Sequence, residues 1–482
     1  MSAVSAPARA DRFDAARALI QEQLTENRIP SIAVAVVQDG KIVWEEGFGW
    51  ADRENRKPAT EHSMYLLAST TKSFTATALM TLVQAGKVDL DRPINDYMGQ
   101  AQLTVRVGDG RQATVRRIAN HTSGLSCAGQ TFFGAEELSK MPPQALALTR
   151  YSQIMMLPGE RFEYCNNGYG VLDYVIEQVS GRSYADYLRQ EVFLPLGMTH
   201  TSVNVGPGLE KYAAARYDRL GDPIPFYEST EPGAGAMFSS AHDLARFGLF
   251  ILKQPLRDQK AILSSASIDA MTRDPVMIRP GNGYALGWQV QAKGGYTVHA
   301  HGGSHSGTKT SFNLIPEKRV GVVLLANANE ISFGGINTAI FKALLPQWKE
   351  MNTDLGVRDK APDKALQPDA TLVGEWRGDI QTHEGAKPMK LQILASGDIH
   401  LQIADQLPTL LSEAAFRDGL LTGVAPTNIQ TSDTKRSPHF VDVALKLRDG
   451  VLNGYVRATA EEKTRQFWIY SLPHWTELRR VQ

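Results

Sequence analysis

Residues 296–326, with the sequence YTVHAHGGSHSGTKTSFNLIPEKRVGVVLLA, carry three strand signals in close succession. Apolar, β-branched and aromatic residues predict strands at residues 296–300, 310–315 and 320–326. A fourth strand is expected just upstream, at residues 285–291. The late part of this region therefore contributes a run of strands to one sheet.

The early part of the chain predicts strands that complete this sheet. Residues 31–37 form an apolar run, Asp39-Gly40 is typical of a tight turn, and residues 41–47 follow as the partner strand. Residues 65–250 alternate helical stretches with loops rich in Gly and Pro. Helical spacing of apolar residues predicts further helices at residues 11–26 and 337–345. Strands on both sides of a helical middle predict an α+β domain whose sheet joins distant parts of the chain.

A chain of 482 residues is too long for a single ordinary core, so two or three domains are expected. We assign residues 1–350 to the first domain and the polar, Pro-containing residues 351–370 to a linker. In residues 371–482, short alternating runs such as 390–394 and 399–403 are separated by Asp-Gly turns. This pattern predicts a separate antiparallel domain, a small closed β-barrel.

The charge balance excludes a strong electrostatic preference for nucleic acid or an anionic membrane, because 51 Lys and Arg residues balance 51 Asp and Glu residues. A small-molecule or peptide substrate must then be selected by a shaped pocket, and self-association stays open. Residues 1–20 lack the apolar stretch of a signal peptide, which favours a cytoplasmic protein. A periplasmic location stays open if a leader was removed. Cys127 and Cys165 are expected as reduced thiols, although a single bridge between them is not excluded.

The segment Leu67-Ala-Ser69-Thr-Thr-Lys72-Ser-Phe74 opens an apolar helix that Gly86 ends. Because three residues make about one helical turn, Ser69 and Lys72 can lie on the same face. A serine hydroxyl is a weak nucleophile until a base takes its proton, and a lysine becomes that base when burial disfavours its charge. The pair therefore predicts a nucleophile and its base.

The same Ser-x-x-Lys pattern occurs at Ser306–Lys309 and Ser432–Lys435. Taken alone, any one instance is more simply a helix cap beside a solvated lysine. Only Ser69 combines a hydrophobic approach over residues 65–68 with a long apolar helix after it. Its context favours Ser69 as the nucleophile.

A second motif, Tyr164-Cys-Asn166, stands between a Gly-containing loop and another helix. On an extended segment residues two apart point the same way, so Tyr164 and Asn166 can face one cleft. A nearby lysine ammonium would stabilise the phenolate of Tyr164 and suit it to proton transfer. Asn166 can hold a substrate carbonyl or support Lys72. The plain alternative is a buried tyrosine whose hydroxyl is merely satisfied.

With His301-Gly-Gly303, the sequence resembles the serine β-lactamase and penicillin-binding family, closest to class C enzymes and S12 peptidases. That family carries Ser-x-x-Lys, Tyr-x-Asn and either Lys-Thr-Gly or His-x-Gly in this order. His-x-Gly also begins at His305 and His383, and the segment Ile315-Pro-Glu-Lys318 selects His301. Further hallmarks recur in order, and the resemblance spans roughly residues 15–345. These hallmarks are His121-Thr-Ser-Gly-Leu125, Pro158-Gly-Glu160, Pro195-Leu-Gly-Met198 and Gly235-Ala-Met-Phe-Ser-Ser240.

The resemblance implies a β-lactamase/transpeptidase-like α+β fold, with an antiparallel sheet flanked by helices, a helical subdomain and a lipocalin-like barrel after it. It implies that His301 and Gly303 belong to the third motif beside the cleft, where His301 binds a substrate carboxylate or tunes Tyr164. The backbone N–H groups of Ser69 and Ser304 would form the oxyanion hole. His121 as a base for Ser123 is disfavoured, because the family places that segment structurally.

Class C β-lactamases usually carry lysine where His301 stands, so the resemblance implies weak recognition of a lactam carboxylate. The His-x-Gly form and the trailing barrel are similar to D-aminopeptidases and related S12 peptidases. We therefore expect an S12-type peptidase or amidohydrolase acting through an acyl-enzyme on amide bonds of small or modified peptides. A family VIII-like carboxylesterase acting on small esters is the alternative. A β-lactamase or a catalytically inactive binding protein is less favoured than either. The sequence shows no metal-ligand spacing and no phosphate-binding loop, so no metal and no cofactor is expected.

Overall fold

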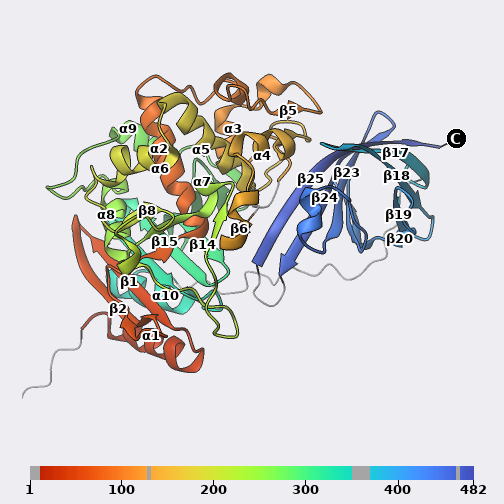
Figure 1. Ribbon diagram of the computed structural model, residues 1–482. Coiled ribbons are helices and arrows are strands. Elements are labelled where there is room, and N and C mark those ends of the chain that lie inside the picture. The colour runs from red at the N-terminus through yellow and green to blue at the C-terminus, as the bar shows by residue number, and fades with distance from the viewer. Residues whose placement is uncertain (1–10, 128–131, 350–367, 369, 463–466, 482) are drawn as a thin grey trace, which may run out of the picture.

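The computed structural model describes residues 11–127, 132–349, 368, 370–462 and 467–481. Figure 1 shows two units side by side, one coloured from red through green to turquoise and one coloured blue. The first unit combines a mixed set of helices with a sheet, and the second consists almost entirely of strands.

The sheet of the first unit joins the two ends of this part of the chain, as the sequence predicted. Its order is β11-β12-β13-β14-β15-β16-β1-β2-β3. The buried apolar strand β1 lies between β2 and β16 and pairs antiparallel with both. The strands are β1 (Ser31–Gln38), β2 (Lys41–Asp52), β3 (Lys57–Pro58), β11 (Val276–Arg279), β12 (Asn282–Tyr284), β13 (Gln289–Lys293), β14 (Tyr296–His305), β15 (Thr308–Ile315) and β16 (Val320–Ala326).

Helices cover both faces of this sheet (Figure 1). On one face, α1 (Asp14–Glu26) and α10 (Gly334–Leu344) pack against alternate residues of β1 and β16. On the other face lies a larger core around α2 (Thr71–Gln84), α5 (Asn166–Ser180) and α8 (Ala241–Ile251). Because every residue of β16 is buried, this strand is covered on both sides. The layered α+β prediction is confirmed.

The rest of this unit consists of shorter elements. They are β4 (Tyr65–Leu66), η1 (Ala68–Thr70), η2 (Ile94–Tyr97), β5 (Thr104–Val105), η3 (Gly110–Gln112), α3 (Val115–Ala119), β6 (Phe132–Gly134), η4 (Ala135–Lys140), α4 (Gln144–Tyr151), β7 (Gln153–Ile154), α6 (Tyr184–Leu188), η5 (Arg189–Phe193), β8 (Thr201–Val203), η6 (Glu210–Tyr212), β9 (Tyr227–Ser229), α7 (Pro232–Gly235), β10 (Met237–Ser239), α9 (Ser265–Ala270) and η7 (Pro316–Lys318).

One predicted strand is wrong in its position. Residues 285–291 do not form a single strand, because β12 ends at Tyr284 and β13 begins at Gln289. Gly287 lies in the turn between them with φ +75, and a Cβ there would meet the backbone oxygen of Lys72 at 2.7 Å. The turn therefore lets the chain approach α2 closely, which a straight strand would not.

The second unit is a nearly closed antiparallel barrel with the order β20-β19-β18-β17-β25-β24-β23-β22-β21. Its interior holds an apolar core, in agreement with the predicted barrel. Its elements are β17 (Gly374–Thr382), β18 (Gly385–Ile393), β19 (Ile399–Ile403), β20 (Thr409–Leu410), β21 (Ser412–Arg417), β22 (Leu420–Ala425), η8 (Asp433–Arg436), β23 (Phe440–Arg448), β24 (Val451–Glu462) and β25 (Phe467–Arg480).

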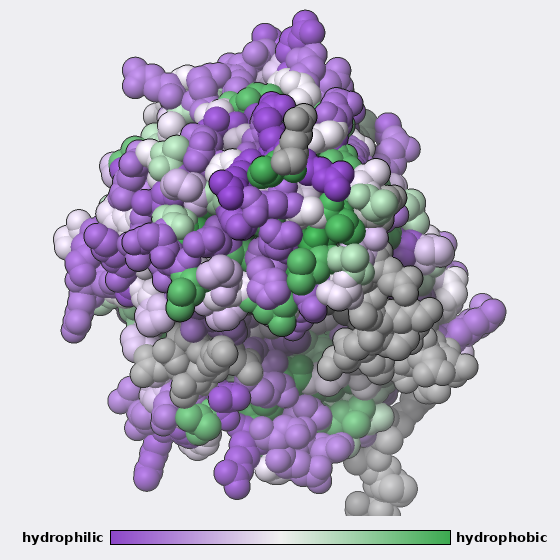
Figure 2. All heavy atoms as spheres, turned by 90° about the vertical axis from the view of Figure 1, so that its right-hand side faces the viewer, coloured by the Kyte–Doolittle hydropathy of each residue, from purple (hydrophilic) through white to green (hydrophobic). Residues whose placement is uncertain are grey.

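The expected linker, residues 351–370, lies outside the described residues except for 368 and 370. The limits 1–350 and 371–482 therefore stay predictions. Figure 2, which looks onto the barrel side, shows a face that is hydrophilic over most of its area, with hydrophobic residues between. Among the described residues, none of the helices has the length and apolar character needed to cross a lipid bilayer.

The barrel docks on the first unit through apolar and charged contacts. Met155 and Met156 pack with Ala444, Tyr455 and Trp475. Lys446 forms an ion pair with Glu160, the Tyr455 hydroxyl donates to Glu163 at 2.8 Å, and Arg457 donates to the carbonyl oxygen of Cys127 at 2.8 Å. Because Glu163 immediately precedes Tyr164 and Glu160 belongs to the same loop, the barrel contacts the loop that carries the second motif.

Candidate active site

Ser69 lies in the short helix η1, just before α2. Strand β14 packs against η1. The Thr70 and Thr310 hydroxyls are 2.8 Å apart, and the Thr310 hydroxyl donates to the carbonyl oxygen of Leu67 at 3.1 Å. Ala68 has a φ of +46, a left-handed conformation that is unusual for a residue with a side chain. The nucleophile predicted from sequence therefore sits on a sharp turn that the neighbouring strand fixes in place.

Gly303 is the point of closest approach between β14 and this turn. A Cβ added at Gly303 would overlap the carbonyl oxygen of Leu67 and come within 2.5 Å of the Thr310 hydroxyl. Only a residue without a side chain fits there without moving backbone atoms.

Replacing Gly303 with alanine should therefore displace the Ser69 turn and lower kcat/KM by about 100-fold, the usual effect of a shift of about 1 Å in a reacting group. Overpacking should also destabilise the fold by about 1–3 kcal/mol. Gly302→Ala is the matched control, because its nearest non-neighbouring atom would be 3.4 Å away. Steady-state kinetics and thermal unfolding of both variants check this; equal losses at 302 and 303 would contradict it.

Lys72 is completely buried and contacts both motifs. Its Nζ donates to the Ser69 Oγ at 3.2 Å, to the Asn166 Oδ1 at 2.7 Å and to the carbonyl oxygen of Ala234 at 2.8 Å. Burial lowers the pKa of Lys72 to about 7, while the charge of Glu231 opposes the shift. A substantial fraction of the amine is then neutral near pH 7 and can accept a proton from Ser69.

Tyr164 lies over the same amine, with the Lys72 Nζ 4.9 Å from the centroid of its ring. The sequence led us to expect a stabilised phenolate, and this expectation is wrong: burial raises the pKa of Tyr164, against the opposing effect of the Ser69 hydroxyl. The residue keeps 37% of its surface exposed, toward the pocket that it lines, and a tyrosine is neutral near pH 7 even at its ordinary pKa of about 10. Tyr164 is therefore a neutral phenol, able to donate a proton.

His301 is buried beside this group and is not among the described residues that line the pocket. Its Nε2 is 2.9 Å from the Tyr284 hydroxyl, and its Nδ1 is 2.8 Å from the carbonyl oxygen of Gly302. Burial lowers the pKa of His301 to about 3, so the ring is neutral at physiological pH. The Tyr284 ring lies 6.0 Å from that of Tyr164. Because His301 is buried away from the pocket, its position disfavours holding a substrate carboxylate, and the tuning of Tyr164 stays a prediction.

His121 also contacts the Tyr164 ring, with centroids 4.4 Å apart. Its Nδ1 accepts a hydrogen bond from the backbone N–H of Cys165 at 3.1 Å, and the Ser123 hydroxyl accepts one from Leu125. Burial lowers the pKa of His121 well below its usual value. These contacts fit the structural role that the resemblance implied for this segment.

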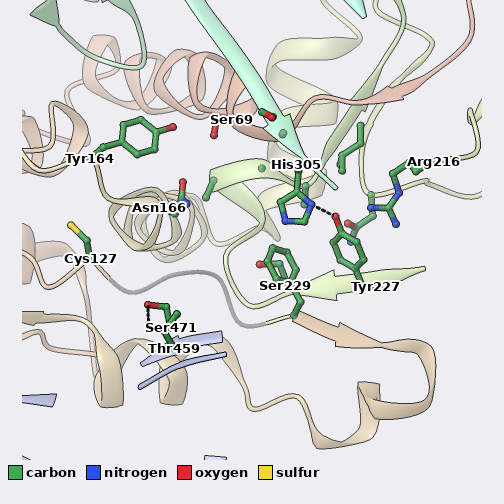
Figure 3. Close-up of a pocket in the computed structure, with 18 of the residues that line it drawn as sticks. Ser69, Cys127, Tyr164, Asn166, Arg216, Tyr227, Ser229, His305, Thr459 and Ser471 are labelled. Carbon is green, nitrogen blue, oxygen red and sulfur yellow. Dashed lines mark hydrogen bonds between the residues drawn. The ribbon is translucent and has the colours of Figure 1, made fainter. Parts of the chain in front are cut away.

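A cavity of about 610 Å³ opens beside the Ser69 side chain (Figure 3). Ser69, Tyr164, Asn166 and Ser304 line it, so the structure brings four of the predicted site residues to one cavity. Both cysteines are buried free thiols, and Cys127 also lines the cavity. Within the described residues, no three His, Cys, Asp or Glu side chains are grouped as metal ligands.

The barrel supplies one wall of this cavity, in Figure 3 the side opposite Ser69. Neighbouring strands β23, β24 and β25 contribute side chains that are linked to one another: Arg457 pairs with Asp442 at 2.7 Å, and the Thr459 hydroxyl donates to Asp442 at 2.9 Å. The barrel residues that line the cavity are Val424, Phe440, Asp442, Arg457, Thr459 and Ser471.

The two other Ser-x-x-Lys serines lie elsewhere. Ser306 is buried at the end of the β14–β15 hairpin and does not line the cavity among the described residues. Ser432 lies on the barrel, before η8, and its hydroxyl donates to Glu384. Neither shares the contacts of Ser69 with Lys72.

Sequence reasoning missed several residues of the site. Gly287 lies inside the segment 285–291 that was predicted as a strand, and Tyr284 lies just before it. The glycines at 283 and 287 are a signal for a turn that this prediction overlooked. Glu231 gave no signal beyond its charge. The barrel residues alternate with buried ones along their strands, which predicts that they face outward but not which of them face another domain.

The profile of the Beta-lactamase family matches residues 16–345. Protein flp of Staphylococcus aureus (strain MRSA252) is 26% identical over 323 residues, which cover 64% of this chain and 62% of flp. Unguisins hydrolase ungD' of Aspergillus campestris is 29% identical over 330 residues, which cover 64% of this chain and 60% of that hydrolase. The chain thus spans less than two thirds of the length of these curated relatives.

Solved structures extend the likeness in fold to the barrel. SurE with D-Leu superposes with a TM-score of 0.61 at 22% identity, over 98% of this chain and 99% of SurE. The octameric penicillin-binding protein homologue from Pyrococcus abyssi gives a TM-score of 0.59 at 24% identity, over 95% and 99%. A class C β-lactamase gives 0.58 at 21% identity, over 70% of this chain and 97% of its own. At these identities the structures show a common fold.

Proposed function

Because this chain belongs to the Beta-lactamase family of serine hydrolases, we propose that it cleaves amide bonds of small or modified peptides through an acyl-enzyme on Ser69. The observation that carries this proposal is the position of Lys72, whose buried amine bonds to both Ser69 and Asn166. One relative is named as a hydrolase of unguisins, and SurE was solved with D-Leu, which supports hydrolysis of a substrate that contains an amino acid.

In the proposed first step, the neutral amine of Lys72 takes the hydroxyl proton while the Ser69 Oγ attacks the substrate carbonyl. The negative charge that develops on the carbonyl oxygen is held by the backbone N–H groups of Ser69 and Ser304, and Asn166 orients the substrate. Tyr164 then gives its proton to the leaving amine and recovers one from Lys72. A water molecule releases the acyl group by the same transfers in reverse, which restores the free Ser69 hydroxyl.

An amide substrate is favoured by the neutral state of Tyr164. An amine leaves only when it is protonated, and the neutral phenol of Tyr164 beside Lys72 can supply that proton. Esterase activity is the second candidate, because aromatic side chains such as Phe132, Phe226 and Phe238 line the cavity and suit a small acyl ester. Rates on peptide p-nitroanilides and on short-chain p-nitrophenyl esters distinguish the two. Turnover of esters alone would replace the peptidase proposal.

The lowered pKa of Lys72 gives a specific pH dependence. The base must be neutral, so kcat/KM should rise about tenfold per pH unit below pH 7 and become level above it. His301→Asn is the matched control. Because the pKa of His301 is about 3, the rise of kcat/KM toward pH 7, the acid limb of the profile, should remain in this variant. A rate profile from pH 5 to about 9 measures it. Loss of the limb in His301→Asn would assign it to the histidine instead.

Because the Pyrococcus homologue is octameric, we also propose that this chain self-associates. Light scattering of the purified protein measures its mass directly, and a particle of about one chain mass would exclude stable assembly.

A further inference from the structure

The cavity extends past Ser69 to an end that the proposed reaction does not use. Figure 3 shows Tyr164 on one side of Ser69, and His305, Tyr227 and Arg216 on the other. These three residues line the cavity, and they come from the end of β14, from β9 and from the loop before β9. The Tyr227 hydroxyl lies 2.7 Å from the Nδ1 of His305.

Arg216 is the charged member of this group and is only 9% exposed. Its guanidinium lies over the Tyr227 ring, with Cζ 4.2 Å from the centroid, and its Nη2 donates to the carbonyl oxygen of Pro225 at 3.0 Å. Its Nη1 is buried without a hydrogen-bond partner. Among the residues that the structure describes, no carboxylate forms an ion pair with Arg216. A buried guanidinium with a free donor is costly unless a ligand satisfies it.

The other charges around the cavity do not compensate Arg216. Arg457 is already paired with Asp442, so these two cancel. Burial and the nearby charge of Arg216 lower the pKa of His305 to about 3, so this ring is neutral. The described lining residues therefore carry one uncompensated positive charge, and guanidinium geometry matches a carboxylate.

The position of Arg216 indicates which part of a substrate it contacts. The leaving amine must lie near Tyr164, which protonates it, and the acyl part must extend to the other side of the Ser69 Oγ. We propose that Arg216 binds a carboxylate carried by the acyl part of the substrate, so that the chain prefers amides of dicarboxylic acids or of acidic residues linked through their side chains. This inference rests on the proposed function, since it takes the acyl direction from the role of Tyr164.

The test compares the mono-p-nitroanilides of glutaric acid and of glutaramic acid, which differ only in a terminal carboxylate or amide. We expect kcat/KM to favour the carboxylate by about 10- to 100-fold, the usual effect of a charged hydrogen bond. Arg216→Gln should abolish this ratio, and Arg216→Lys should keep part of it because the charge remains. The succinic and adipic homologues define the distance between the reacting carbonyl and the carboxylate.

A second measurement does not depend on turnover or on the folding of an Arg216 variant. Calorimetric titration of the Ser69→Ala variant with the same two anilides should show tighter binding of the carboxylate by a similar factor. Turnover of both anilides at equal kcat/KM, or equal affinities in the titration, would overturn the role of Arg216 while leaving the proposed function intact. If neither anilide nor any ester is turned over, the proposed function fails, and the titration still decides whether Arg216 binds a carboxylate.

Discussion

Ser69→Ala should lower turnover by about 1,000-fold or more and leave the fold unchanged. The variant removes one hydroxyl that, in the described contacts, accepts a hydrogen bond from Lys72, so little packing is lost. Without the hydroxyl no acyl-enzyme can form, and replacing the nucleophile of a catalytic group that acts as a unit usually costs several orders of magnitude in kcat. Steady-state kinetics on the best substrate, with circular dichroism and thermal unfolding, measure both parts of this prediction.

Ser432→Ala is the matched control, because Ser432 carries the same Ser-x-x-Lys pattern on the barrel, where its hydroxyl bonds to Glu384. We expect this variant to keep its activity. Full activity in Ser69→Ala together with a loss in Ser432→Ala would place the reaction on the barrel and end the present proposal.

Lys72→Met should lower kcat/KM by about 100- to 10,000-fold, the range expected when a general base is removed. Methionine has a similar length and fills the same buried space, but it cannot take the Ser69 proton. The substitution leaves the Asn166 Oδ1 and the carbonyl oxygen of Ala234 without their donor, which costs about 1–3 kcal/mol. It also removes a charge from a fully buried position, which is favourable and offsets part of that loss.

The limb near pH 7 should disappear together with the activity, because Lys72 is the group that titrates there. Lys435→Met is the control, since Lys435 belongs to the Ser-x-x-Lys pattern of the barrel. A Lys72→Met variant that keeps both its rate and its pH limb would show that another group activates Ser69.

Local patterns predicted much of the fold. Strand β16 was predicted with its observed limits, and β1 and α10 within a few residues, because apolar runs and helical spacing report burial directly. The segment 285–291 failed because its turn depends on a distant contact: Gly287 lies against Lys72 of α2. Strand propensity along the sequence contains no information about which distant residue the chain will contact.

The candidate site was predictable to the extent that its residues occur in ordered motifs. Ser69, Lys72, Tyr164 and Asn166 were named from sequence and lie together, and their catalytic roles remain to be tested. The protonation state of Tyr164 could not be predicted, since its pKa depends on how completely the surrounding residues exclude water. The charge at Arg216 was equally hidden, because lone arginines are common and only the cavity distinguishes this one.

The barrel is the least predictable contribution. Its strands were expected from Asp-Gly turns and alternation, but the docking that directs Asp442 and Arg457 toward Ser69 depends on contacts between domains. The pair Tyr455–Glu163 likewise links a barrel strand to the residue before Tyr164. No local pattern predicts which face of a barrel meets another domain.

The central claim is that one serine, activated by one buried lysine, carries the acyl group. The most direct measurement is labelling of the full chain with a fluorophosphonate, followed by mass spectrometry of the proteolysed protein. We predict a single adduct on the peptide that contains Ser69, strongly reduced in Lys72→Met and absent in Ser69→Ala. An adduct on Ser306, Ser432 or another serine, retained when Ser69 is replaced, would contradict it.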